Sequence, residues 1–522
     1  MKRKKITKFI LMAALVCSLG ATGCTSTKQK SDVKNASTKK VDGGEFILAT
    51  GEPLNSINPI GQGSSDAQRM LLPIFECLYR VGNDGTRYYL AESYKVSDDN
   101  KKITIKLHDK LKWHDGKPIT ADDLVWNLKI RKDKKLDPYF TEINGKPVDV
   151  KKVDNLTVEI NLPEPSASYV SMIGLLQMIP SHIYKNVDDI FNCEANQKGI
   201  GSGPYKVKSS SNDSLVLERV NDYYRGKPNL ETIAFKVITD ESAREVAFKN
   251  GEISVLEIKS DEQLKQYKDN SDFEIFSFEE GRNNYMAFNN KSAIVNDIKV
   301  RQAISLALNK SDILSGAYGS SDIAVEANTV FNPKNLLYSD SISGYKQDIN
   351  KSKDLIKETN LSGKKLHLIY NETRINQKNT AIIIQQQLKK VGVDVEIEGL
   401  DVNVFLGALF NNEKGKSYDL AINGVGCNGD PDLLREMFSS KSTNMISSDK
   451  LEKLWMDGAV ASDKKTRLDI YTNIQQEIKD LYSIYPISST NIILATHNDV
   501  KGLDSIKAIP LFEDYLKIYK VK

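Results

Sequence analysis

The stretch LAESYKVSDDNKKITIKLHDKLKWHDGKPITADDLVWNLK, residues 90–129, contains the local patterns from which the fold is predicted. Lys102–Leu107 alternates polar and apolar residues, which predicts a strand with one buried face. Thr120–Arg131 opens with a threonine suited to an N-cap and carries two acidic residues in its first turn, which predicts a helix. Between them, His114-Asp115-Gly116 predicts a turn in which Gly116 has a positive φ and Asp115 accepts hydrogen bonds from backbone amides.

The same two patterns alternate along the rest of the chain. Further strands are predicted at Leu156–Leu162, Ser214–Arg219 and Lys365–Tyr370. Further helices are predicted at Val300–Leu308 and Thr380–Val391, the second ended by Gly392 and followed by the strand sequence VDVEIEGL. This alternation predicts an α/β fold with mixed sheets. A chain of 522 residues is long enough for two or three domains.

The amino terminus has the pattern of a secretory signal. A basic segment from Lys2 to Lys8 precedes the apolar stretch Phe9–Ala21, which at about a dozen residues is too short to span a membrane. Ala21-Thr22-Gly23 then leads into Cys24, which resembles the lipid-attachment motif of bacterial lipoproteins, with Ala21 in place of the usual leucine. We expect lipid on Cys24, a flexible linker after it, and a mature chain outside the cytoplasm, tethered to the cell membrane. The alternative is a plain secretory signal with an incidental cysteine.

Charge and side-chain composition exclude several classes of function. The chain has 72 basic and 69 acidic residues, and the predicted signal removes five basic ones, so the mature protein is nearly neutral and no nucleic-acid partner is expected. Cys77, Cys193 and Cys427 remain after the signal and the lipid site, without CxxC spacing, and are interpreted as small buried residues. The five histidines form no HxH or HExxH motif, so no metal site and no cofactor are predicted.

Five blocks of sequence occur in a recognisable order. They are WHDGKPITADDL (Trp113–Leu124); GSGPYKV (Gly201–Val207) with NDYYRGKPNLETIAFKVI (Asn221–Ile238); YMAFNN and KVRQAISLALNKSDIL (within Tyr285–Leu314); QQQLKKVGVDVEI (Gln385–Ile397); and YDLAINGVGCNGDPDLL (Tyr418–Leu434). In this order they resemble the family 5 extracellular solute-binding proteins, the binding subunits of peptide and nickel ABC importers.

The resemblance implies a two-lobed, periplasmic-binding-protein-like fold of class II with an additional domain and a hinge between the lobes. Strand crossings near Gly281–Tyr285 and Thr490–His497 would form that hinge. Mapped by order, the parts are a signal peptide at 1–23, a linker at 24–42, lobe I at 43–70, 199–283 and 498–522, the additional domain at 71–198, and lobe II at 284–497. The family also implies a monomer that works with membrane permease and ATPase subunits.

In peptide-binding relatives, an acidic residue pairs with the α-amine of the ligand and a basic residue with its carboxylate. Arg374 stands about where relatives place the carboxylate-binding arginine, and a guanidinium suits a carboxylate because it forms two parallel hydrogen bonds. Gly424 and Cys427 stand where relatives have Trp and Asp, and a neutral thiol cannot balance an ammonium group. Asp430 or Asp432 could substitute, or could cap a helix at Leu433–Phe438.

The resemblance therefore points to a short peptide ligand held by seven candidate residues, with Gln68 and Arg69 as weaker candidates. The seven are Tyr285, Asn289, Asn290, Arg374, Gly426, Cys427 and Asp430. Two alternatives remain at this point, a binder of a nickel chelate or other small solute and a secreted hydrolase. No GxSxG motif is present, and no catalytic residue is predicted.

Overall fold

The computed structural model describes residues 39–61, 64–82, 85–410, 417–427, 429–438, 444–461, 463–503 and 514–522. The predicted signal peptide and the predicted lipid site Cys24 lie outside these residues. Lys40–Lys522 forms one unit by its internal contacts. In its described part, no helix combines the length and the apolar character needed to cross a membrane.

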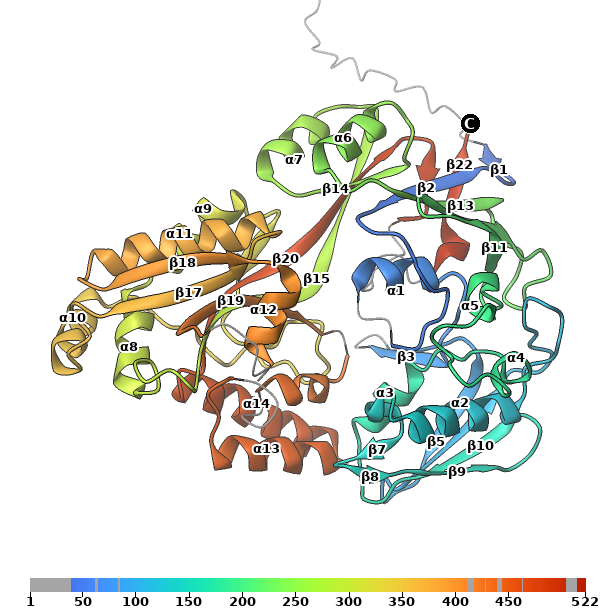
Figure 1. The fold of residues 1–522 in the computed structure, drawn as a ribbon, viewed down its shortest axis with the longest axis horizontal. Helices are drawn as coiled ribbons and strands as arrows, with labels where there is room; N and C mark the ends of the chain where they lie inside the picture. Colours follow the sequence, from blue (N-terminus) through green and yellow to red (C-terminus); the bar gives the residue numbers. More distant parts are fainter. Residues whose placement is uncertain are drawn as a thin grey trace, which may run out of the picture. The chain divides into compact units, whose positions relative to one another are not determined.

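A four-stranded sheet combines an early strand with residues 205–237 in the order β11-β12-β13-β2, in which only β13 and β2 are parallel (Figure 1). Its apolar face packs around Phe46 and Phe235 with residues of α1. A small sheet β1-β22-β21 pairs Lys40 with Val521 and so joins the two ends of the unit. The elements are β1 (Lys40–Val41), β2 (Glu45–Thr50), α1 (Ser65–Leu71), β11 (Tyr205–Ser210), β12 (Ser214–Arg219), β13 (Thr232–Val237), β21 (Val500–Lys501), η5 (Tyr515–Lys517) and β22 (Tyr519–Val521).

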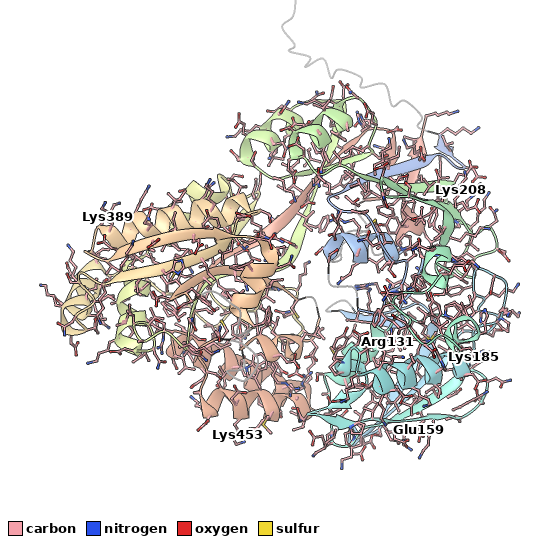
Figure 2. The ribbon with its side chains drawn as sticks, in the orientation of Figure 1. Arg131, Glu159, Lys185, Lys208, Lys389 and Lys453 are labelled. Carbon is pink, nitrogen blue, oxygen red and sulfur yellow. The ribbon has the colours of Figure 1, made fainter. Side chains whose placement is uncertain are left out.

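A second, antiparallel sheet in the order β5-β6-β10-β9 has its own core, which contains Trp113, Leu124 and Ile160. Helix α2 packs on this sheet, and its Arg131 is buried, whereas Glu159 is a strand residue of β10 (Figure 2). The elements are β3 (Tyr79–Gly82), β4 (Gly85–Tyr88), β5 (Ala91–Val96), β6 (Lys102–Leu107), α2 (Ala121–Lys134), η1 (Pro138–Phe140), β7 (Glu142–Ile143), β8 (Lys146–Pro147), β9 (Asp149–Lys152), β10 (Thr157–Asn161), α3 (Tyr169–Gly174), α4 (Ser181–Tyr184) and α5 (Ala195–Lys198).

The third sheet has seven strands and mixes parallel and antiparallel pairs. Its order is β14-β20-β15-β19-β17-β18, with β16 paired to β20. The strands are β14 (Val255–Ile258), β15 (Phe273–Phe288), β16 (Ala324–Glu326), β17 (Lys365–Asn371), β18 (Asp394–Leu400), β19 (Leu420–Gly426) and β20 (Ile484–His497). The helices around it are α6 (Glu241–Lys249), α7 (Asp261–Lys268), α8 (Ile298–Ala307), α9 (Lys310–Tyr318), α10 (Ile349–Glu358), α11 (Ile375–Lys389), α12 (Val402–Leu409), η2 (Pro431–Leu434), η3 (Glu436–Phe438), α13 (Asp449–Val460) and α14 (Lys464–Asp480).

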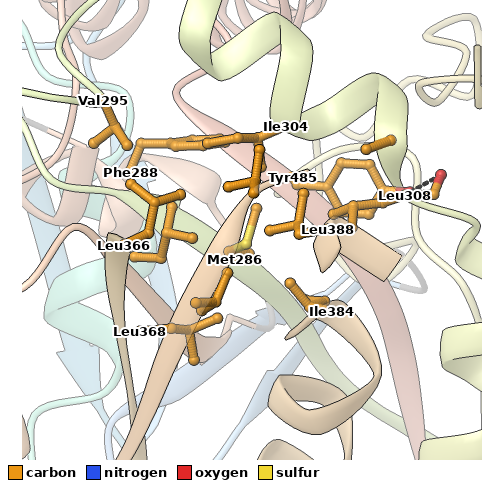
Figure 3. Close-up of a cluster of buried hydrophobic side chains, with 14 of the residues drawn as sticks. Met286, Phe288, Val295, Ile304, Leu308, Leu366, Leu368, Ile384, Leu388 and Tyr485 are labelled. Carbon is orange, nitrogen blue, oxygen red and sulfur yellow. Dashed lines mark hydrogen bonds between the residues drawn. The ribbon is translucent and has the colours of Figure 1, made fainter. Parts of the chain in front are cut away.

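The long strands β15 and β20 run side by side through several cores (Figure 1). At one end of this pair, Ile492 and Leu494 of β20 join the core of the first sheet. At the other end, Met286 of β15 and Tyr485 of β20 lie in the core between the third sheet and helices α8 and α11 (Figure 3). The register between them shifts at Glu279–Arg282, where Gly281 has a φ of 72°. The two predicted crossings, Gly281–Tyr285 and Thr490–His497, therefore lie in one paired ribbon.

Several predicted elements are confirmed. The strands at Lys102–Leu107 and Ser214–Arg219 have the predicted bounds, and Thr120 caps α2 in a reciprocal pair with Asp123. The helix predicted from Thr380 begins earlier, at Ile375. The sequence pattern did not show its first turn, because Asn376–Lys378 are polar and continue no apolar stripe. Its start matters for the site described below.

The turn His114-Asp115-Gly116 is confirmed, and it also fixes the glycine-rich segment 201–203. Gly116 has a φ of 86°, and Asp115 accepts a hydrogen bond from the Lys117 amide at 3.2 Å. The His114 ring accepts from the Gly201 amide at Nδ1 (3.1 Å) and donates from Nε2 to the Gly203 carbonyl (3.0 Å). Both ring nitrogens are used by the neutral form, and burial lowers the pKa of His114 to about 4. Two of the family blocks thus meet in one contact.

Candidate ligand-binding cavity

A cavity of about 1090 Å³ lies against the third sheet where β15 meets the start of α11. Strands β15 and β20 contribute Arg282, Asn284 and Thr490, and the segment before α11 contributes Arg374. The opposite wall comes from the end of β2, from β14 and from helices α6 and α7. Its volume is at the upper end of the range for small-molecule sites, which leaves room for a ligand larger than one amino acid.

Two arginines give the β15 side of the cavity a positive charge. Arg282 is partly buried, whereas the Arg374 side chain is exposed. In the part of the chain that the structure describes, no carboxylate oxygen lies within 4.0 Å of either guanidinium. Burial, followed by the charge of Arg374, lowers the pKa of Arg282, while Glu280 acts in the opposite direction. The two guanidiniums are therefore close enough to repel one another.

The backbone of β19 makes room for Arg282. Strands β15 and β19 are antiparallel, with Arg282 opposite Gly426 and Asn284 opposite Gly424. A Cβ on Gly424 would lie 2.8 Å from both Nε and Nη2 of Arg282, and closer still to Oδ1 of Asn284. Glycine at this position therefore lets the Arg282 side chain lie across β19, where its Nε donates to Asn284 Oδ1 at 3.4 Å.

Arg374 occupies the N-cap position of α11, in an extended conformation and without a side-chain cap hydrogen bond. Ile375, Asn376 and Gln377, the first turn of this 15-residue helix, also line the cavity. The amides at a helix amino terminus and the helix dipole both favour a negative charge there. The guanidinium and the helix start thus act in the same direction.

Acidic side chains line the opposite wall. Burial would raise the pKa of Glu257, but Lys259, Arg69 and Arg244 outweigh it and lower the pKa to about 2. Glu241 pairs with Arg244 at 3.2 Å. Glu52 and Glu262 are exposed, and no described lysine or arginine lies within 4.0 Å of either. Among the described residues, carboxylates and guanidiniums that make no ion pair therefore line the same cavity.

The structure places the other predicted site residues away from this cavity. Tyr285 and Cys427 are buried together in a core behind β15 and β19. Asn289 donates to the Tyr418 carbonyl at 2.7 Å and Asn290 to the Met445 carbonyl at 3.0 Å, so their side chains fix neighbouring loops. Gly426, at the end of β19, is exposed.

Asp430 is used within the protein. Its two carboxylate oxygens receive two hydrogen bonds from Arg467, at 2.7 and 3.1 Å, and both side chains are buried. It also caps η2, because its side chain accepts a hydrogen bond from the Asp432 amide. The helix expected at Leu433–Phe438 is instead two short 3-10 helices, the first of which begins at Pro431. Burial raises the pKa of the Cys427 thiol to about 12, which keeps it neutral.

A second cavity of about 520 Å³ contains Gln68 and Asp432. Asp432 accepts hydrogen bonds from Ser168 at 2.8 Å and from Tyr471 at 2.9 Å, which links the residue before α3 to helix α14. Arg69, the other weaker candidate, lies 3.7 Å from Asp66. The described residues contain no group of three His, Cys, Asp or Glu side chains that could hold a metal ion.

Of the residues predicted from the sequence, Arg374 lines the cavity, whereas Arg282, Asn284 and the acidic residues of the lining were not among the predicted ligand-binding residues. Arg282 follows Glu279, Glu280 and Gly281 in a polar part of β15, so its local sequence gives no signal that sets it apart. Nothing in the local sequence indicates that Gly424 is its neighbour.

Comparison with known proteins agrees with this architecture. Residues 86–445 match the model of the bacterial extracellular solute-binding proteins, family 5. The oligopeptide-binding protein AppA of Bacillus subtilis is 27% identical over 517 residues, which is 92% of each chain. The crystal structure of the ABC transporter substrate-binding protein CtaP of Listeria monocytogenes superposes with a TM-score of 0.86 at 32% identity, over 92% of this chain and 100% of that one.

A putative peptide-binding protein AppA from Clostridium difficile gives a TM-score of 0.83 at 34% identity, with the same coverage. These likenesses confirm the predicted two-lobed α/β fold of the binding-protein type with mixed sheets. The order of the five sequence blocks, the sheet topology and the matched residues agree, and the chain belongs to family 5 of the bacterial extracellular solute-binding proteins.

Proposed function

We propose that this protein is the substrate-binding subunit of an ABC importer and that it captures short peptides in the cavity beside β15 and α11. It acts as a monomer, is held at the outer face of the cell membrane by lipid on Cys24, and delivers its ligand to membrane permease and ATPase subunits. It binds the peptide without changing it chemically. The lobe and domain boundaries predicted from the sequence belong to the same proposal.

The observation that supports a peptide most strongly is the arrangement of charge in the cavity. A peptide at neutral pH carries an ammonium group at one end and a carboxylate at the other. Arg374 and the start of α11 offer a site for the carboxylate, whereas Glu52 and Glu262 offer one for the ammonium group. A charge removed from water requires such a partner, because an unpaired one costs several kcal/mol. Asp430 is a poorer partner for the amine, since Arg467 already neutralises it.

The first prediction concerns Arg374. Pools of tripeptides to pentapeptides should raise the melting temperature, since a ligand at 100 times its Kd stabilises a protein by about 2.7 kcal/mol. For a peptide chosen from such a pool, Arg374→Gln should weaken binding of the free acid by about tenfold or more, because a charged hydrogen bond contributes about 1.5–3 kcal/mol. The same peptide with a C-terminal amide should bind both proteins equally. Isothermal titration calorimetry measures each affinity.

Lys378→Gln is the matched control, since Lys378 is an exposed cation on α11 outside the cavity lining, and it should bind like the wild type. The peptide proposal fails if no pool shifts the melting temperature. The role of Arg374 fails if its replacement leaves the preference for the free acid intact.

A further inference from the structure

We propose that Arg282 and Arg374 together form a double-cation subsite that selects peptides ending in aspartate or glutamate. Such a residue presents two carboxylates side by side, one from the chain end and one from the side chain. The inference rests on the peptide-binding function proposed above and names the class of peptide that this cavity prefers.

The position of Arg282 is built into the sheet. It lies on β15 next to the register shift, opposite β19, and its guanidinium occupies the space that a side chain at position 424 would fill. Asn284 accepts a hydrogen bond from Nε, which leaves the two terminal nitrogens of the guanidinium for other partners. The cavity lining includes both Arg282 and Asn284.

The charge of this subsite is balanced only in part from within. Glu280 also lines the cavity and favours the charged form of Arg282, but its carboxylate accepts a hydrogen bond from Thr490 at 2.5 Å and makes no ion pair with Arg282 in the described residues. Holding two guanidiniums near one another, one of them partly buried, costs free energy unless an anion binds between them. One carboxylate can accept a forked pair of hydrogen bonds from one guanidinium. A peptide with a single terminal carboxylate on Arg374 would therefore leave Arg282 without an ion-pair partner.

A second carboxylate on the last residue of the peptide fits this requirement. The first turn of α11 adds amides beside Arg374, so this end of the cavity disfavours neutral and basic side chains and favours an acidic one. The opposite wall, with Glu52 and Glu262, repels an acidic side chain, which fixes the direction of the peptide in the cavity.

The test compares two peptides that differ by one charge, Ala-Ala-Ala-Glu and Ala-Ala-Ala-Gln, both as free acids. With the full chain, calorimetry should give at least a tenfold tighter Kd for the glutamate peptide. Arg282→Gln should reduce that ratio to about one, because it removes the partner of the second carboxylate. Gly424→Ala should also lower the ratio, because its Cβ displaces the guanidinium although Arg282 is retained.

Arg244→Gln is the matched control. It removes another guanidinium from the same cavity, but one that is paired with Glu241, and the ratio between the peptides should stay at its wild-type value. Melting curves without ligand establish that each variant is folded. Equal affinity of the wild type for both peptides, or a ratio that survives Arg282→Gln, overturns the subsite while the peptide function stands.

A nickel(II)–citrate complex forms a third arm, because a polycarboxylate chelate also presents clustered negative charges. If this complex binds in an Arg282-dependent manner and neither peptide binds, the two arginines bind a polycarboxylate, and both the peptide function and the selection of acidic peptide ends are wrong. If neither the peptides nor the complex binds, both proposals fail.

Discussion

At the scale of single residues, Asp430 shows how a candidate ligand residue can be a structural one. Its carboxylate and the Arg467 guanidinium form a forked, buried ion pair, and Arg467 also donates to the Gly458 carbonyl at 2.9 Å. Tyr471 lies beside both groups. The pair therefore joins the loop after β19 to helices α13 and α14.

Removing one partner of this pair should be costly. Asp430→Asn is expected to lower the free energy of unfolding by about 3–5 kcal/mol, because it leaves the Arg467 charge buried without a partner. Urea unfolding measures the change. Asp457→Asn, which breaks the exposed pair between Lys453 and Asp457, should cost less than about 1 kcal/mol.

The same variant separates the two roles considered for Asp430. If Asp430→Asn keeps the wild-type stability but loses peptide affinity, the carboxylate serves the ligand and not the fold. A stability loss with unchanged affinity at temperatures where the variant is folded assigns it to the fold.

At the scale of elements, the contact between the turn after β6 and segment 201–203 depends on a neutral histidine. The pKa of His114 is lowered to about 4 by burial, whereas an unfolded chain binds this proton near pH 6.5. Between these values the unfolded state holds more protons, so stability rises with pH across this window and is lost as pH falls from 6.5 towards 4. Below pH 4 the loss from this group is complete.

We therefore expect the wild type to lose up to about 3 kcal/mol from this group as pH falls through that window, and His114→Gln to lack this contribution. Urea unfolding at pH 7, 6 and 5 measures the slope for both proteins. Lys117→Gln, an exposed change in the same turn, should keep the wild-type slope. Parallel slopes for the wild type and His114→Gln would contradict the prediction.

At the scale of the whole molecule, β15 and β20 form the ribbon through which the described cores are connected, and the cavity lies beside it. The shift in register at Gly281, whose positive φ suits glycine, interrupts regular pairing at the predicted crossing. We predict that the lobes close about this crossing, because a ligand that contacts both cavity walls would bind a closed arrangement better than an open one and so shift the population towards closure.

Closure should be visible in solution. Small-angle X-ray scattering should give a smaller radius of gyration for the protein saturated with peptide than for the ligand-free protein. The Arg374→Gln variant, measured at a peptide concentration below the Kd of that variant for the peptide, should keep the radius of gyration of the ligand-free protein. An unchanged radius in the wild type, with calorimetry showing full occupancy, would contradict a closing mechanism.

What the sequence by itself determined is local in origin. Alternation at Lys102–Leu107 and the threonine cap with its acidic first turn at Thr120–Asp123 specify a strand and a helix through contacts between near neighbours, and the order of such blocks indicated the family. Arg374, which precedes the block Gln385–Ile397, was predicted from its position relative to the family, and it lines the cavity.

Only the tertiary structure decided which residues share the cavity and which are paired elsewhere. Arg282 lies over Gly424 because two antiparallel strands fix their register, and no pattern within either strand shows it. Asp430 meets Arg467 across 37 residues, and His114 meets Gly201 across 87. Burial and charge pairing depend on such distant neighbours. The identity of a side chain therefore shows which partners it can bind, but the folded structure decides whether that partner is a ligand or another residue of the protein.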